Sequence, residues 1–328
     1  MIPSRALELI RRHPTAAYFL LTYAFSWTLW KAFDRIYLSG RLLALPFIML
    51  GIFGPGIVSI WLSAVENPAP RKGSRQASVI AFLVAWLPAT LLVTLDQVLT
   101  ENRAASFTTV VWCSAAALMP AFVVSSLFSS APGVRRHLES LARPRGAAGY
   151  YLLALLLFAA IWLLGMPISR ALGLPVTPRR LPESTATLGL AGAVALDFFY
   201  NFLLNGLSEE PGWRGFALPR LQARRSPLVA SVILWILWAI WHAPAYLGGF
   251  AAQTPADTLV EWVFVLPVTV VFTWIYNRTG GSLLVVALLH PAMNTTAHFL
   301  PLTLGGIGLL VAFAMFAVVR DRMWLTHR

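Results

Sequence analysis

Long apolar runs constrain this chain more than any other feature of its sequence. Ten of them follow one another, and each is close to the roughly 20 residues that span a ~30 Å hydrocarbon core as a helix. A transmembrane β-barrel would instead show shorter segments of alternating polarity. The sequence predicts an all-α, polytopic helical membrane protein with about ten transmembrane helices. They cover residues 15–33, 42–65, 77–99, 107–130, 150–169, 186–207, 227–249, 259–277, 281–300 and 302–319.

The distribution of charge predicts how the chain crosses the membrane. The formal net charge is +12, from 25 basic and 13 acidic residues. If the N-terminus is cytoplasmic, 18 basic residues fall on the cytoplasmic side, and seven fall on the other: Lys31, Arg35, Arg41, Arg103, Arg170, Arg179 and Arg180. Cytoplasmic loops of membrane proteins carry such an excess. We therefore expect both termini in the cytoplasm, and lipid headgroups rather than nucleic acid as partners of this charge.

Two breaks organise the chain. The segments 68–76 and 173–183 are rich in proline and basic residues. Residues 1–172 hold apolar runs with few ionisable groups, whereas the runs in 184–328 contain several. We expect one integral membrane domain whose polar chemistry lies in the C-terminal part. The first run lacks a small-residue cleavage site at its end, so it is expected to be an uncleaved helix. The single cysteine, Cys113, excludes an internal disulfide.

The ionisable residues in apolar surroundings form the candidate site, because such groups mark function by default in a membrane. The stretch SEEPGWRGF, residues 208–216, supplies two glutamates and an arginine, and two histidines and an asparagine lie in later runs. Spacings of four place Glu210 with Arg214, and His290 with Asn294, on shared helix faces. The six candidates are Glu209, Glu210, Arg214, His242, His290 and Asn294.

Helical rise puts these segments at compatible depths. Glu209 lies 16 residues before Arg225, and His242 lies 16 residues after Ser226. Each distance is at most ~24 Å along a helix at ~1.5 Å per residue. His290 lies 10 residues beyond Gly280, or about 15 Å by the same rise. We therefore expect Glu209, His242 and His290 to line one water-accessible cavity that opens toward the cytoplasm.

Two hydrolytic chemistries fit these residue types. A carboxylate beside a histidine can activate water, while a second histidine and an asparagine amide stabilise an oxyanion. Alternatively, Glu209, His242 and His290 could hold Zn²⁺ and leave one position for water. The HExxH pattern of soluble metalloproteases is absent. We predict the mechanism without a metal or other cofactor, because asparagine is an unusual zinc ligand, and keep zinc as the alternative.

Three motifs, in order over residues 208–294, resemble those of the CPBP family of intramembrane endopeptidases (CAAX prenyl proteases and bacteriocin-processing enzymes, also called Abi). The first is the Glu209-Glu210 pair with Arg214, continued by GFALPRLQ. In the second, Trp238 replaces the usual phenylalanine before His242. The third is SLL at residues 282–284, followed by His290 and Asn294. The stretch GIFGPGIVSI, residues 51–60, resembles the family more weakly.

The resemblance implies an integral membrane endopeptidase of a bacterial or archaeal plasma membrane. It implies that Glu209 activates water and that a peptide bond is cleaved at the cytoplasmic face. Family substrates include prenylated CAAX tails and bacteriocin-like peptides, and the sequence selects neither. A carrier with a Glu–His–Asp relay and a non-catalytic scaffold are the rival functions. Paired halves are typical of carriers, whereas the polar residues here lie in one half only.

Other polar and aromatic residues have structural interpretations. Asp197, Asn201 and Asn205 are spaced by four and are interpreted as helix-packing contacts, with support of Glu209 as the alternative. His298, near the end of its run, is interpreted as structural. The 13 tryptophans are interpreted mainly as lipid-facing or interfacial residues.

Overall fold

The computed structural model describes residues 4–67 and 75–326, and all regular elements in these ranges are helices. The predicted all-α class is confirmed. The N-terminal elements are α1 (Ser4–Arg12), α2 (Pro14–Leu38), η1 (Leu42–Ala44), α3 (Leu45–Ile52), α4 (Gly54–Glu66), α5 (Arg75–Leu99), α6 (Phe107–Ala116), α7 (Leu118–Ser126) and α8 (Pro132–Ala142). The others are α9 (Ala148–Ala171), α10 (Ser184–Asn201), η2 (Phe202–Gly206), α11 (Leu207–Glu210), η3 (Pro211–Ala217), α12 (Leu218–Gln222), α13 (Pro227–Tyr246), α14 (Pro255–Arg278), α15 (Leu283–Phe299) and α16 (Leu304–Arg320).

Each of the ten apolar runs falls on a helix or on consecutive helices, but fewer of them qualify as spans. In the described part of the chain, six helical stretches are long and apolar enough to cross a membrane, or seven if the bent pair α3–α4 is one span. The apolar helices α15 and α16 are only 17 residues long. Helix α2 has 25 residues, but its threonine, tyrosine and tryptophan residues lower its hydropathy. The protein is an integral membrane protein. Because six or seven helical stretches of the described chain meet these criteria, the predicted count of about ten spans is loose.

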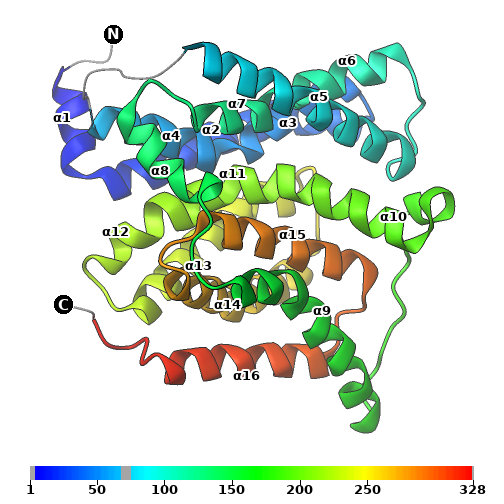
Figure 1. The fold of residues 1–328 in the computed structure, drawn as a ribbon. Helices are drawn as coiled ribbons and strands as arrows, with labels where there is room; N and C mark the ends of the chain where they lie inside the picture. The colour runs from blue at the N-terminus through cyan, green and yellow to red at the C-terminus, as the bar shows by residue number, and fades with distance from the viewer. Residues whose placement is uncertain (1–3, 68–74, 327–328) are drawn as a thin grey trace.

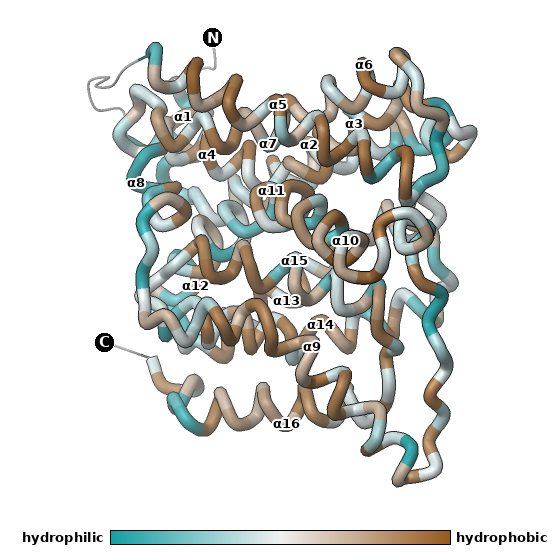
Figure 2. Tube along the Cα trace, turned by 45° about the vertical axis from the view of Figure 1, so that its right-hand side comes forward, coloured by the Kyte–Doolittle hydropathy of each residue, from teal (hydrophilic) through white to brown (hydrophobic). Residues whose placement is uncertain are grey.

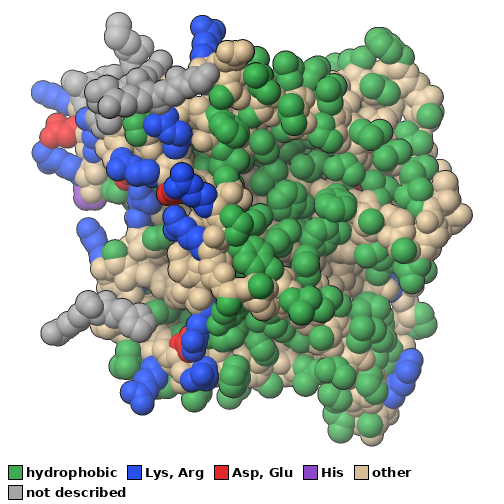
Figure 3. Space-filling view, viewed as in Figure 1, with side chains coloured by type: hydrophobic (Ala, Val, Ile, Leu, Met, Phe, Trp, Pro, Cys, Tyr) green, Lys and Arg blue, Asp and Glu red, His purple; other side chains and the backbone are tan. Residues whose placement is uncertain are grey.

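The ends of the molecule differ in charge. Helix α1 and the C-terminal end of α16 lie at the same end of the bundle (Figure 1). Lysine and arginine side chains gather at that end, while hydrophobic side chains cover much of the remaining visible face (Figure 3). Apolar residues also dominate the long helices in the hydropathy view (Figure 2). A charged end beside an apolar band is typical of a membrane protein. The cytoplasmic location of this end stays a prediction from charge.

A helical segment from Ser184 to Gln222, kinked near its start at Gly189, forms the centre of the fold. It comprises α10, η2, α11, η3 and α12, and it lies between a layer made of α1–α8 and a layer made of α9 and α13–α16 (Figure 1). Helix α4 packs against α11 and η3, and α15 packs against α10 and η2. The segment that carries SEEPGWRGF is therefore covered from both sides.

Glycines allow the backbone of α4 to approach this central segment closely. A Cβ atom on Gly56 would lie 2.7 Å from the Ser208 carbonyl oxygen, and one on Gly212 would lie 2.6 Å from the Pro55 carbonyl oxygen. Small residues permit such contacts between membrane helices. The pair α3–α4 is bent by 49° just before Gly54, with Pro55 in the first turn of α4. This packing explains the conformation of the GIFGPGIVSI stretch.

The two predicted breaks have different outcomes in the structure. The segment 68–76 lies outside the described residues, apart from Arg75 and Gln76 at the start of α5. Residues 172–183 are not helical and join α9 to α10. Helix α9 packs mainly against α15 and α16, so its neighbours come from the C-terminal part of the chain.

Helix α8, which none of the apolar runs predicts, covers the central segment near the basic end. Its His137 is half-buried, and its Nε2 lies 3.0 Å from the Ser59 hydroxyl oxygen. The imidazole also packs edge-on against Phe216, 6.0 Å between ring centroids. Desolvation, with a smaller contribution from the charge of Arg220, lowers the pKa of His137 to about 3. His137 is therefore neutral at physiological pH and acts here as a packing residue.

Candidate active site

The glutamate pair lies on a short α-helix between two π-helical segments. Helix α11 holds both glutamates, and the wider turns of η2 and η3 flank it. Such π-turns occur frequently at functional sites because they redirect side chains within a continuous helix. Pro211 begins η3, and its missing N–H removes one ordinary helical hydrogen bond. Here the glutamates and Arg214 all point into the interior, where none is more than 1% exposed.

Three N–H groups hold the Glu209 carboxylate. Asn205 donates from Nδ2 to Oε1 at 3.1 Å, while Trp213 and Trp238 donate from Nε1 to Oε2 at 3.0 and 2.7 Å. An ionised carboxylate offers about four acceptor positions, so one remains after these three contacts. The Glu209 carboxylate is therefore fixed and buried, with capacity for one more hydrogen bond.

His242 and His290 both lie beside the indole of Trp238. Their ring centroids are 5.7 and 5.6 Å from it, and both imidazoles interact electrostatically with Glu209. The Nδ1 of His242 lies 2.9 Å from the Trp238 carbonyl oxygen, which can only accept, so Nδ1 carries a hydrogen. In neutral His242 the other nitrogen, Nε2, is therefore an acceptor. The structure thus brings Glu209, His242 and His290 to one place.

Glu210 joins the arginine to the second histidine. Its Oε1 accepts from Arg214 Nη1 at 3.0 Å and from His290 Nδ1 at 2.7 Å. The guanidinium lies between two aromatic rings, 4.5 Å from the Trp238 centroid and 4.4 Å from that of Phe272. The predicted Glu210–Arg214 contact is present, and the contact to His290 fixes the orientation of that imidazole.

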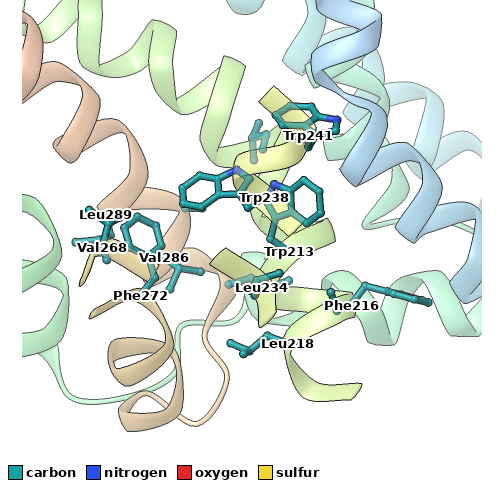
Figure 4. Close-up of a cluster of buried hydrophobic side chains, with 14 of the residues drawn as sticks. Trp213, Phe216, Leu218, Leu234, Trp238, Trp241, Val268, Phe272, Val286 and Leu289 are labelled. Carbon is teal, nitrogen blue, oxygen red and sulfur yellow. The ribbon is translucent and has the colours of Figure 1, made fainter. Parts of the chain in front are cut away.

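The aromatic residues correct one interpretation of the sequence. Trp213, Trp238 and Trp241 are buried and gather in the interior with Phe272, as Figure 4 shows. Trp213 and Trp238 bind Glu209 directly and are not lipid-facing. Spacing could have indicated this, because Trp213 lies four residues after Glu209 and Trp238 lies four before His242. A buried indole N–H needs an acceptor.

The polar stripe on the central segment continues from Glu209 to the far end of the site. Asn294 Nδ2 lies 3.1 Å from Asn205 Oδ1 and 3.4 Å from Asn201 Oδ1, and donates to both. Asn201 in turn donates to Asp197 Oδ2 at 3.1 Å, and His298 Nδ1 lies 2.8 Å from Asp197 Oδ1. Asn205 is thus a direct partner of Glu209. Both amide hydrogens of Asn294 are committed to the stripe, so its contact with the site runs through Asn205.

The surface has cavities of about 500, 400 and 460 Å³, and none of the three is lined by Glu209, His242 or His290. The expected cytoplasmic opening therefore stays a prediction. Some polar atoms within the cluster still have unused hydrogen-bonding capacity. Glu210 Oε2, and Nε and Nη2 of Arg214, are buried without a hydrogen-bond partner among the described residues. Buried groups of this kind normally bind water or a ligand.

The alternative zinc site fits this arrangement poorly. No group of three or more His, Cys, Asp or Glu side chains in the described ranges is placed to hold a metal ion. Three N–H donors already occupy the carboxylate of Glu209. The two imidazoles each keep Nε2 available, which is a possible ligand atom, but zinc sites normally use at least three protein ligands.

Comparison with known proteins agrees with this site. Residues 191–296 match the family model described as "Type II CAAX prenyl endopeptidase Rce1-like". The chain is 29% identical over 107 residues to CAAX prenyl protease 2 of Methanococcus maripaludis, which is 31% of this chain and 40% of that protein. The chain thus spans less than half of this relative's length. The matched range contains all six candidate residues. Over this C-terminal part the chain is similar to the CPBP family of CAAX proteases, and this similarity supports the resemblance that the three sequence motifs indicate.

Proposed function

We propose that the protein is an intramembrane endopeptidase that hydrolyses a peptide bond with water activated by Glu209. One observation carries this proposal: a buried carboxylate is fixed by three N–H donors beside two imidazoles whose Nε2 atoms have no partner among the described residues. General base, orienting group and oxyanion donor are the roles that hydrolysis requires. Similarity to the CPBP family over residues 191–296 supports the same reaction.

The residues divide the proposed reaction between them. Water binds the remaining acceptor position of Glu209 and the Nε2 atom of His242. Glu209 removes a proton as the water oxygen attacks the peptide carbonyl carbon, and the carbonyl oxygen becomes negative. His290, oriented by Glu210, stabilises that oxygen by donating a hydrogen bond from Nε2. Collapse of the tetrahedral intermediate breaks the C–N bond, and Glu209 returns the proton to the leaving nitrogen.

The substrate and its side of approach are part of the proposal. We infer that a CAAX-like or bacteriocin-like peptide, bound next to membrane lipid, is cleaved at the cytoplasmic side of the plasma membrane of a bacterium or archaeon. The excess of basic residues at one end supports this orientation. The name of the methanococcal relative, an archaeal CAAX prenyl protease, supports the first substrate class.

A cleavage assay tests the function. Purified protein in lipid nanodiscs is incubated with farnesylated and unmodified forms of one CAAX-type peptide, and with a bacteriocin-type precursor. Mass spectrometry then identifies the products. New peptide termini are expected with at least one of them. Transport of an intact peptide into sealed vesicles would support a carrier, and normal cellular function of a variant that cannot cleave would support a scaffold.

Dialysis against a strong chelator is expected to leave the cleavage rate unchanged, because no step above uses a metal. Elemental analysis of the active protein should find less than about 0.1 zinc per chain, since a zinc site normally requires at least three protein ligands. Loss of activity on dialysis, followed by recovery when zinc alone is added, would replace this mechanism with one in which Glu209, His242 and His290 hold Zn²⁺. A known zinc protease carried through the same dialysis is the positive control.

Asn205→Ala is expected to lower kcat by about tenfold with little change in KM, because it removes one of three hydrogen bonds that position Glu209, worth about 1–1.5 kcal/mol.

Asn294→Ala, alone and combined with Asn205→Ala, separates two roles for Asn294. If Asn294 acts through Asn205, the double variant is no slower than Asn205→Ala. If it donates directly to the oxyanion, its loss costs a further factor of about 10²–10³ in kcat. Asn67→Ala, on the surface away from the site, is the control.

A further inference from the structure

The cavity of about 460 Å³ lies at the end of the molecule opposite α1 and the basic surface. Residues from the C-terminal ends of α2 and α5, from the segment before α10, and from α10 and α15 line it. None of the six candidate residues is among them. A cavity of this size accommodates a small ligand or a lipid headgroup.

The inner part of this cavity offers hydrogen-bond acceptors. Asp96, Gln97 and Asp197 line it and are 5%, 2% and 9% exposed. The carboxamide oxygen of Gln97 is buried and accepts no hydrogen bond from the described residues, while its nitrogen faces Asp96 Oδ2 at 3.3 Å. The two aspartates are near enough to interact electrostatically. Asp197 accepts from Asn201 and His298, so the unsatisfied Gln97 oxygen beside the Asp96 carboxylate is the position that a hydrogen-bond donor would fill first.

The outer part of the cavity instead carries basic side chains. Arg179 and Arg180 line the cavity from the segment before α10 and are exposed, next to the exposed Glu101. Arg180 pairs with Glu183. Two tyrosines, Tyr37 and Tyr200, complete the wall. Guanidinium groups bind phosphate well, and tyrosine is enriched at the level of lipid headgroups. The cavity is thus acidic inside and basic at its mouth.

A metal ion does not fit this distribution. No three carboxylate, imidazole or thiol side chains in the described part of the chain are placed to share one. The separated acceptors instead suit the three N–H groups of a primary ammonium, and the arginines suit an anionic group a few bonds away. We propose that this cavity binds a phosphoethanolamine group, with the ammonium at Asp96, Gln97 and Asp197 and the phosphate at Arg179.

Binding of soluble glycerophosphoethanolamine to the purified protein tests the proposal by calorimetry. Glycerophosphocholine is the matched probe, because its trimethylammonium group donates no N–H. The choline compound is expected to bind at least tenfold more weakly. Asp96→Asn is expected to weaken ethanolamine binding about tenfold or more, as for loss of a charge-assisted hydrogen bond. Gln97→Leu, which changes no charge, is expected to weaken it about fivefold.

Asp257→Asn, at an exposed acid that does not line the cavity, is the control and should bind like the unchanged protein. Equal affinity for the two headgroups, or ethanolamine binding unaffected by both cavity variants, would overturn the proposal. Nanodiscs of phosphatidylcholine with one-tenth phosphatidylethanolamine distinguish a membrane lipid from a soluble compound as the source of the phosphoethanolamine group. Enrichment of the ethanolamine lipid on the protein assigns a membrane lipid, and its absence alongside soluble binding assigns a soluble phosphoethanolamine compound.

Discussion

Glu209→Gln is expected to lower kcat for peptide cleavage by at least the 10²–10⁴-fold that a general base contributes. Glutamine has nearly the same shape but cannot take a proton from water. Its amide nitrogen would also face an N–H group where the carboxylate now accepts three hydrogen bonds. Binding of substrate is expected to persist, because the surrounding side chains are unchanged. Single-turnover kinetics with the cleaved peptide, beside an equilibrium binding measurement, separate the two effects.

Glu139→Gln is the matched control for this experiment. Glu139 lies on the surface in α8, where it pairs with Arg143 and Arg145, and it has no contact with the site. Its replacement should leave kcat within about twofold, because exposed ion pairs contribute little. Elution as a single species and an unchanged thermal transition must accompany the loss in Glu209→Gln. If Glu209→Gln keeps a kcat within threefold of the unchanged protein, Glu209 is not the general base, and His242 becomes the candidate for that role.

The sequence predicted the helical class because length and hydropathy alone require it. All ten apolar runs are helical, since backbone groups in lipid must form their hydrogen bonds within the segment. The number of spans was harder to predict, because breaks depend on packing. The bend before Gly54 accompanies a close approach of α4 to Ser208 and Gly212, which no local pattern predicts. The run 281–300, for example, contains a helix of only 17 residues, which is too short to be counted as a membrane-spanning helix.

The candidate site was predictable to the extent that it depends on spacing within one helix. The Glu210–Arg214 contact follows from an interval of four residues. The contact between His290 and Glu210 does not, because the two are 80 residues apart and only the packing of α15 on the central segment joins them. The roles of Trp213 and Trp238 were missed because hydropathy does not distinguish a lipid-facing indole from a buried donor. The π-turns were missed because no residue pattern specifies them reliably.

Arg214→Met is expected to have the largest effect on stability of any single replacement at the site. The guanidinium is fully buried, pairs with Glu210 and lies between Trp238 and Phe272. Removing it leaves the Glu210 carboxylate buried beside His290 without its strongest partner. Breaking a buried ion pair in this way costs about 3–5 kcal/mol. Reversible unfolding in mixed detergent micelles, followed by tryptophan fluorescence, measures the change in the free energy of unfolding.

The double variant Glu210→Gln with Arg214→Met distinguishes a lost ion pair from lost packing. It should recover more than half of the stability, because replacing both members removes the uncompensated charge. Arg143→Met is the matched control: Glu139 and Arg143 have the same spacing on a helix, but Arg143 is 77% exposed, and the expected cost is below about 1 kcal/mol. A cost for Arg214→Met no larger than this control would show that the buried pair does not hold the fold. A double variant as unstable as Arg214→Met would assign the effect to the aromatic rings that enclose the guanidinium.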